Sequence, residues 1–106
     1  DAITAGRAYL DANCAYCHRQ GGTANANGLY INWDYEGSEL NKGMFKIPTN
    51  YNAPGLQYDI VPGSPDESIL WYRMTQSSAP AIMPQIGRSV NHEEGIEIIR
   101  NYIMNL

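Results

Sequence analysis

The chain contains few of the aliphatic side chains that normally fill a protein core. Its 106 residues include 6 Leu, 11 Ile, 2 Val and 1 Phe, about 19% of the total, a share that borders on that of disordered chains. The net charge is only -4, and eight tyrosines and two tryptophans are available for packing, which argues against charge-driven disorder. We therefore expect one small folded domain over residues 1–106, with a core completed by something other than side chains.

Several other features are absent, and each absence excludes a class of protein. No run of 18 or more apolar residues occurs, which excludes a transmembrane helix in this sequence. The seven Lys and Arg residues are scattered singly among eleven acidic ones, so neither nucleic acid nor an anionic membrane is an expected partner. Two cysteines are too few for a disulfide-rich mini-protein. No basic and apolar targeting segment is present.

Three segments carry the signals of helices. Residues 3–14 have an apolar stripe and no proline. Residues 64–67 supply a serine N-cap, a proline at the first helical position and a capping glutamate, which predicts a helix from there to about Thr75. A last helix is predicted to begin at Asn91. The stripe of the first helix consists of Ile3, Gly6, Leu10 and Cys14. The stripe of the last helix consists of Ile96, Ile99, Ile103 and Leu106.

The segment between the first two helices differs in composition. Residues 21–60 contain six Gly, six Asn, four Tyr and two Pro, and an irregular segment of this length usually wraps around something. Alternating apolar residues over 29–35 predict a short strand paired with 58–61, and residues 38–44 predict one helical turn. The fold class is therefore all-α, mainly helices with long loops and at most a short two-stranded sheet.

The residues that carry chemistry follow the first helix directly. Cys14-Ala15-Tyr16-Cys17-His18 is the C-x-x-C-H pattern by which c-type haem is attached. Cysteines three residues apart on a helical turn present both sulfurs on one side, where each can add to one haem vinyl group. The histidine that follows can then donate an imidazole nitrogen to the iron. We expect one haem c, bound covalently through Cys14 and Cys17, with His18 as an iron ligand.

Three other interpretations of the motif are weaker. A local disulfide between the two cysteines would leave His18 without a role. A thioredoxin-like redox pair needs a strand before the motif, whereas a helix is predicted here. A zinc site formed by Cys14, Cys17, His18 and His92 has an unfavourable spacing, because adjacent Cys17 and His18 strain a tetrahedral shell.

The first predicted helix resembles that of class I (monohaem) cytochromes c. In that family a glycine and an apolar residue before the motif, here Gly6 and Leu10, pack against an aromatic of the last helix. The counterparts in this sequence are Gly95, Ile99 and Tyr102. Residues 61–65, 68–74 and the Met83-Pro84 pair are similar to small cytochrome c domains of bacterial exported multidomain redox proteins.

The resemblance implies a cytochrome c fold, with three to four helices wrapped around the haem. It also implies a bacterial protein located in the periplasm or secreted. One departure is that many class I cytochromes have a proline about a dozen residues after the haem histidine, and its carbonyl orients the imidazole. Here no proline occurs before Pro48, so the acceptor of the His18 hydrogen bond is not identified.

A methionine is the expected second axial ligand. Met83 lies in a proline-containing loop between two predicted helices, where a ligand can be rigidly held, and it resembles the family's ligand loop. Met74 and Met104 lie in predicted helices, where methionine usually fills the core. Met83 is the expected ligand, and Met44, Met74, His92 or no protein ligand remain alternatives.

Haem also carries two propionates that need donors when they are partly buried. The candidates are Arg73, Trp33, Tyr35, Tyr51 and Asn52.

These expectations predict electron transfer rather than an enzyme. With His18 and Met83 on the iron no substrate can bind to it, so the domain would act as a small carrier or as part of a larger exported protein. We expect a monomer that docks briefly, at an exposed haem edge, to a redox protein or a neighbouring redox domain. The alternatives are a haem enzyme or gas or redox sensor with a displaceable sixth ligand, and a binding module with a structural haem.

Overall fold

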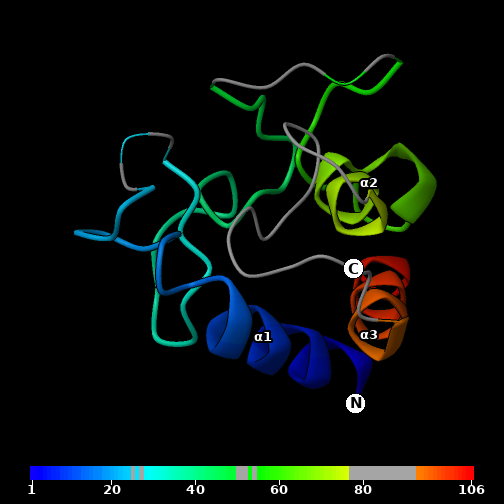
Figure 1. Ribbon diagram of the computed structural model, residues 1–106, viewed down its shortest axis with the longest axis horizontal. Helices are drawn as coiled ribbons and strands as arrows, with labels where there is room; N and C mark the ends of the chain where they lie inside the picture. The colour runs from blue at the N-terminus through cyan, green and yellow to red at the C-terminus, as the bar shows by residue number, and fades with distance from the viewer. Residues whose placement is uncertain (25, 27, 50–52, 54, 77–92) are drawn as a thin grey trace.

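The computed structural model describes residues 1–24, 26, 28–49, 53, 55–76 and 93–106. In chain order its helical elements are α1 (Ala2–Asn13), the short 3-10 helix η2 (Pro65–Glu67), α2 (Ile69–Thr75) and α3 (Glu93–Met104). Figure 1 shows α3 beside α1, with α2 above α3 and the long irregular segment above and to the left of α1. The prediction of a mainly helical protein is confirmed. None of the described helices is long and apolar enough to cross a membrane.

The contact between α1 and α3 depends on two glycines. A Cβ atom on Gly6 would overlap the ring of Tyr102 in α3, and a Cβ on Gly95 would overlap the ring of Tyr9 in α1. Each helix therefore offers a glycine to an aromatic ring of the other. Leu10 is buried beside this crossing. The close approach expected at Gly6 and Gly95 is confirmed.

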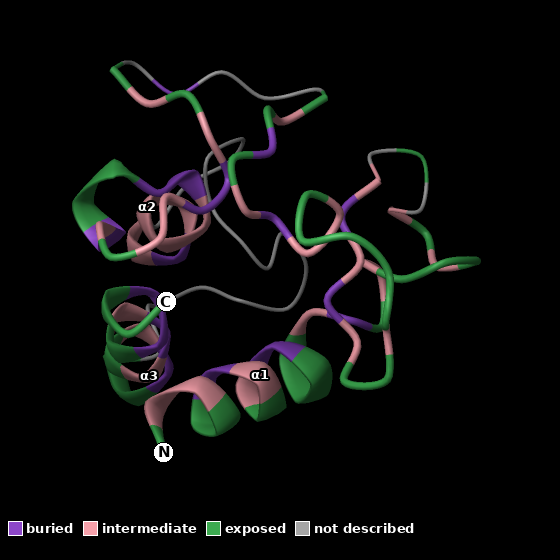
Figure 2. Ribbon diagram, turned by 180° about the vertical axis from the view of Figure 1, so that it is seen from behind, coloured by how far each residue is buried: buried purple, intermediate pink, exposed green. Residues whose placement is uncertain are grey.

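The buried side chains face inward from all three helices. Figure 2 shows a buried stripe on the inner face of α1 and of α3, and exposed residues on their outer faces. Ile99 and Ile103 of α3 are completely buried, and Met74 of α2 joins the same apolar cluster. The predicted stripe of the last helix fails at its end, because Leu106 follows the helix and is exposed. Its predicted beginning at Asn91 lies outside the described residues.

The helix predicted from residue 64 to about Thr75 is interrupted. Ser68 has an extended backbone, with φ -102° and ψ 122°, between η2 and α2. Its hydroxyl donates to the Ser64 carbonyl at 2.9 Å and accepts the Val61 N–H at 2.9 Å. The first N–H groups of α2 then bond to another segment, since Ile69 donates to the Tyr58 carbonyl at 3.0 Å and Leu70 to that of Asp59 at 2.9 Å. Tertiary hydrogen bonds thus replace the predicted serine cap.

The predicted strand over 29–35 is wrong. Its N–H groups bond to separate partners: Tyr30 donates to the Asn41 carbonyl at 2.7 Å and Ile31 to the His18 carbonyl at 2.9 Å. Segment 58–61, the expected partner, instead forms isolated parallel bridges, Met44 with Ile60 and Tyr58 with Ser68. The alternation of apolar residues reflects the burial of Leu29 and Ile31 and not a ladder.

The turn predicted over 38–44 is present without becoming a helix. The Met44 N–H donates to the Glu39 carbonyl at 3.1 Å, and the Lys42 N–H donates to the Ser38 carbonyl at 3.2 Å. This turn leads into the segment that pairs with Ile60.

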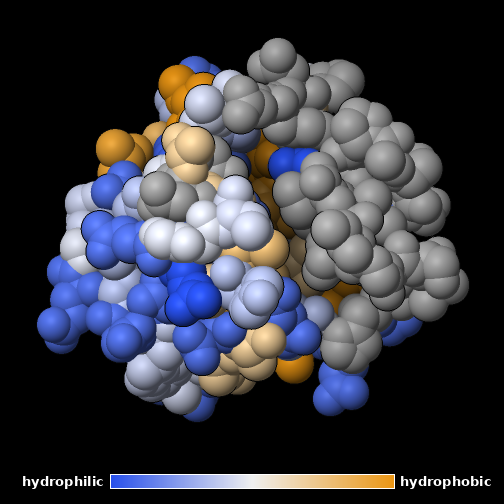
Figure 3. Space-filling view, turned by 60° about the vertical axis from the view of Figure 1, so that its left-hand side comes forward, coloured by the Kyte–Doolittle hydropathy of each residue, from blue (hydrophilic) through white to orange (hydrophobic). Residues whose placement is uncertain are grey.

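On the face seen in Figure 3 polar side chains predominate among those coloured by hydropathy, and apolar ones lie at the upper left and towards the middle of the view.

Replacing Gly6 by Ala tests the helix crossing. The added methyl group would overlap the Tyr102 ring close to its attachment to the backbone, so α1 and α3 must separate. We expect the free energy of unfolding to fall by about 1–3 kcal/mol, measured by urea denaturation. The control is Ala8→Leu on the exposed face of α1, which should change stability by about 0.5 kcal/mol or less. Equal stability of the Gly6→Ala variant and the wild type would contradict the close approach.

Candidate functional site

The two cysteines and the histidine lie on a single turn at the end of α1. The Cys14 N–H closes the helix by donating to the Leu10 carbonyl at 2.9 Å. The Cys14 carbonyl then accepts the N–H groups of Cys17, at 3.2 Å, and of His18, at 3.1 Å. The three residues therefore follow α1 as one compact turn, which is the backbone arrangement that the motif predicts.

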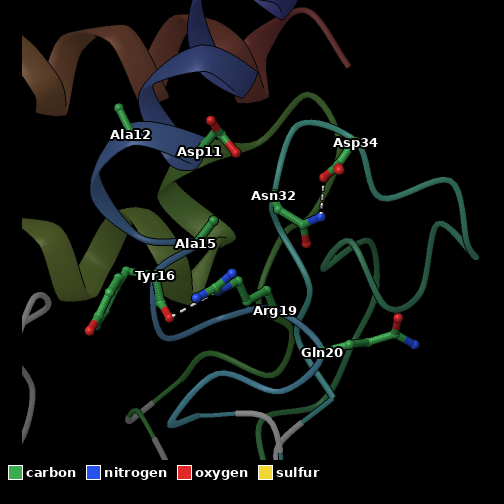
Figure 4. Close-up of a pocket in the computed structure, with 8 residues that line it drawn as sticks. All are labelled: Asp11, Ala12, Ala15, Tyr16, Arg19, Gln20, Asn32 and Asp34. Atoms are coloured by element: carbon green, nitrogen blue, oxygen red, sulfur yellow. Dashed lines mark hydrogen bonds between the residues drawn. The ribbon is translucent and has the colours of Figure 1, made fainter.

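The side chains of the turn differ in exposure, and Tyr16 is the one that faces solvent. Cys14 packs against the buried apolar cluster, and Ala15 belongs to it. Tyr16 is 77% exposed, and the Arg19 guanidinium lies 5.8 Å from the centroid of its ring (Figure 4). Cys17 is half-buried, and the Nδ1 atom of His18 is buried. The chemically active side chains thus face inward, whereas the residue between them faces water.

The chain beyond His18 returns to fasten this turn. The Cys17 carbonyl accepts the Ala24 N–H at 3.0 Å, and the His18 carbonyl accepts the Ile31 N–H at 2.9 Å. Gly22 lies against the Cys17 carbonyl so closely that a Cβ atom would overlap it. Every carbonyl of Cys14, Cys17 and His18 therefore has a backbone partner. The sequence analysis missed Gly22, for which the only signal was a Gly-Gly pair after the motif.

Of the two cysteines, Cys14 has the environment of an unreactive thiol. Neither forms a disulfide. Burial raises the pKa of the Cys14 thiol to about 11, and the neighbouring Cys17 adds to this effect. A redox-active dithiol needs the opposite, a thiol whose pKa is lowered so that the thiolate forms near neutral pH. The environment of Cys14 is therefore unlike that of a thioredoxin-type pair.

The zinc interpretation also lacks support in the part of the chain that is described. There, no three His, Cys, Asp or Glu side chains gather in a way that could hold a metal ion. Cys14, Cys17 and His18 are adjacent in sequence but do not converge on one point. His92, the fourth residue of that hypothesis, lies outside the described residues.

Two of the aromatic residues predicted to reach a propionate, Trp33 and Tyr35, have described contacts with other protein groups. The Trp33 N–H donates to Asp11 Oδ1 at 2.8 Å, and the guanidinium of Arg7 lies 5.0 Å from the Trp33 ring centroid. These contacts fix Trp33 to the outer side of α1. The Tyr35 hydroxyl accepts Asn41 Nδ2 at 3.2 Å. Neither contact set includes a residue of the cysteine turn.

The candidate iron ligands are only partly described. The ligand candidates Met83 and His92 lie outside the described residues, as do the propionate candidates Tyr51 and Asn52. Of the alternative ligands, Met44 is half-buried and Met74 is buried, and both pack with the cluster that Cys14 contacts. Met104 is half-exposed at the end of α3.

Arg73, the remaining propionate candidate, lies beside a buried ion pair that the sequence analysis missed. Lys46 and Asp59 are each 8% exposed, with Lys46 Nζ 3.9 Å from Asp59 Oδ2. Burial raises the pKa of Asp59 to about 6, although the positive charges of Lys46 and Arg73 act in the opposite direction. No sequence signal links a lysine and an aspartate thirteen residues apart in an irregular segment.

One pocket beside the cysteine turn is not suited to a haem. It has a volume of about 500 Å³ and is lined by side chains that include Asp11, Arg19, Asn32 and Asp34. Figure 4 shows these polar groups around it, with Asn32 Nδ2 donating to Asp34 Oδ1 at 2.6 Å. A porphyrin needs apolar surface. The apolar side chains near the motif belong instead to the cluster that Cys14 contacts.

Comparison with known proteins adds no family. No protein-family model matches the chain, and neither a curated protein nor a solved structure matches it significantly. The chain's own residues therefore carry the functional argument.

The raised pKa of Asp59 predicts a pH dependence of stability. A carboxyl with a higher pKa in the folded state stabilises the fold fully below pH 3.8, its ordinary pKa, and loses this contribution as the pH rises through about 6. The free energy of unfolding of the wild type should therefore fall, relative to that of Asp59→Asn, by on the order of 2–3 kcal/mol between pH 4 and 7.

Urea denaturation at several pH values measures this difference. The control is Glu36→Gln, which removes an exposed carboxyl and should follow the wild type across the range. A difference between wild type and Asp59→Asn that stays constant with pH would contradict the assignment.

Proposed function

We propose that the chain is an electron-transfer domain of the class I cytochrome c type, with one haem c attached through Cys14 and Cys17. The proposal rests on the C-x-x-C-H turn at the end of α1, whose cysteines lie at half-buried positions beside the apolar cluster. The crossing of α1 and α3 at Gly6 and Tyr102 supports it, because the same pair was expected from the resemblance to that family. The proposed fold is the cytochrome c fold.

The residues present suit a covalently bound haem. When bound, the haem supplies an iron that gains and loses one electron. The two thiols are free and adjacent on one turn, as two thioether bonds require. The backbone bonds of Cys17 to Ala24 and of His18 to Ile31 fix the main chain from which the Cys17 thiol and the imidazole project. The apolar cluster excludes water from the inner side of the turn.

The shortage of aliphatic residues fits the same proposal. A porphyrin is a large apolar body, and its burial supplies area that Leu, Ile and Val would otherwise provide. In the irregular segment of residues 21–60, the apolar side chains of Leu29, Met44 and Ile60 pack in or against the cluster that Cys14 contacts. Such a lining has little reason to fold alone.

We assign the second axial position to Met83. With a histidine and a methionine as protein ligands no coordination position is left for a substrate, so the domain carries electrons and is not itself an enzyme. Its partner would be a redox protein or a neighbouring redox domain that docks at an exposed haem edge. The proposed setting is the periplasm or exterior of a bacterium, and the proposed state is a monomer.

Attachment is tested by producing the chain in bacterial cells with an active cytochrome c maturation system. We expect a haem that resists extraction by acidified acetone, whereas the Cys14→Ala/Cys17→Ala variant should lose it and most of its far-UV circular dichroism. Met104→Ala, which alters a half-exposed residue, should retain the haem. A colourless wild type with full circular dichroism would overturn the proposal.

The sixth ligand is tested with Met83→Ala. Removal of the thioether should lower the midpoint potential and allow the ferrous form to bind carbon monoxide, measured by absorbance spectra with and without the gas. Met74→Leu and Met44→Leu serve as controls for the alternative ligands and should leave the spectrum unchanged. Rapid binding of carbon monoxide by the wild type at neutral pH would favour a haem enzyme or sensor. An unchanged spectrum of Met83→Ala would exclude this methionine.

A further inference from the structure

Asp59 is a buried acid that pairs with Lys46 and also experiences the positive charge of Arg73. Lys46 belongs to the irregular segment of residues 21–60, and its Nζ lies 3.9 Å from Asp59 Oδ2. The positive charge of Arg73, in α2, lowers the pKa of the same carboxyl. The Asp59 main chain is fixed on both sides, because its N–H donates to the Lys46 carbonyl at 2.7 Å and its carbonyl accepts the Leu70 N–H at 2.9 Å. The main chain of Asp59 is therefore bonded to both segments.

This charged group borders the apolar cluster beside the cysteine turn. The next residue, Ile60, is completely buried in the cluster that Cys14 contacts. The Lys46 side chain passes over Gly28, with its Cε 3.7 Å from where a Cβ of that glycine would lie. Leu29, which follows, belongs to the same cluster. Apolar surroundings screen charge weakly, so a change of charge within this core acts on Asp59.

The carboxyl is the group here that can change its protonation near neutral pH. Lys46 and Arg73 are the charged groups acting on it within the described part of the chain. Burial brings the pKa of Asp59 to about 6. A small change in nearby charge is therefore enough to alter how much of it is protonated.

We propose that Asp59 takes up a proton when the domain is reduced and releases it on oxidation, so that a proton moves with the electron. The inference rests on the proposed function. In the reductive step one electron comes from a reduced redox protein and one proton comes from solvent to the Asp59 carboxylate. In the oxidative step both leave, the electron to an oxidised partner and the proton to solvent. The added negative charge of the reduced core and the added proton offset each other.

The midpoint potential of the haem-loaded protein, measured against pH by spectroelectrochemistry, tests the coupling. In the wild type the potential should fall as the pH rises from about 5 to 8, and Asp59→Asn should lose this part of the dependence. Glu36→Gln, which changes an exposed carboxyl, should keep it. Lys46→Gln removes a positive charge facing Asp59 and should move the fall to higher pH. An Asp59→Asn variant with the full wild-type dependence would overturn the inference.

A second measurement needs no variant. Carbon-13 NMR of aspartate-labelled wild-type protein follows the Asp59 carboxyl through a pH titration in each oxidation state. We expect proton affinity to be about threefold or more higher in the reduced state, a shift of about half a pKa unit. Identical titrations in the two states would refute the coupling and leave the haem assignment intact. A protein without a haem spectrum would instead refute the proposed function.

Discussion

The close crossing of α1 and α3 is the contact on which the rest of the architecture depends. Gly6 and Gly95 let each helix approach an aromatic ring of the other, and the core cluster forms along the line where they meet. Cys14 is the residue that ends α1. The way α1 lies on α3 therefore sets the position of the cysteine turn relative to the core.

The irregular half of the molecule is organised by the segment around residues 58–60. On one side its backbone bonds to residues 43–46, and on the other it bonds to the first residues of α2. Residues 58–60 therefore form single β-bridges to two neighbouring segments and not a sheet. Because it supplies acceptors to the N–H groups that begin α2, it also explains why the helical segment is broken at Ser68. The ion pair of Lys46 and Asp59 arises at the same junction.

Local signals predicted some of these features and missed others for physical reasons. The helices at the two ends were predictable because helical periodicity depends on residues three or four apart, whereas the Gly6 contact was expected from the resemblance to class I cytochromes c. The turn at Cys14 was predictable because its chemistry requires that spacing. The strand over 29–35 was a wrong prediction because burial of alternate residues does not require a paired strand. Asp59 and Lys46 were missed because only the fold brings them together.

The cysteine turn is held by hydrogen bonds to its backbone carbonyls, so some of its side chains can vary without loss of these bonds. Bonds from Ala24 and Ile31, together with those within the turn, involve main-chain atoms and do not use the side chains of these residues, whereas Gly22 must stay small because a Cβ atom there would overlap the Cys17 carbonyl. Tyr16, which projects into water between the cysteines, is then a position where substitutions leave the thiols in place. The side chain at position 16 can therefore change while the main-chain bonds of the turn stay the same.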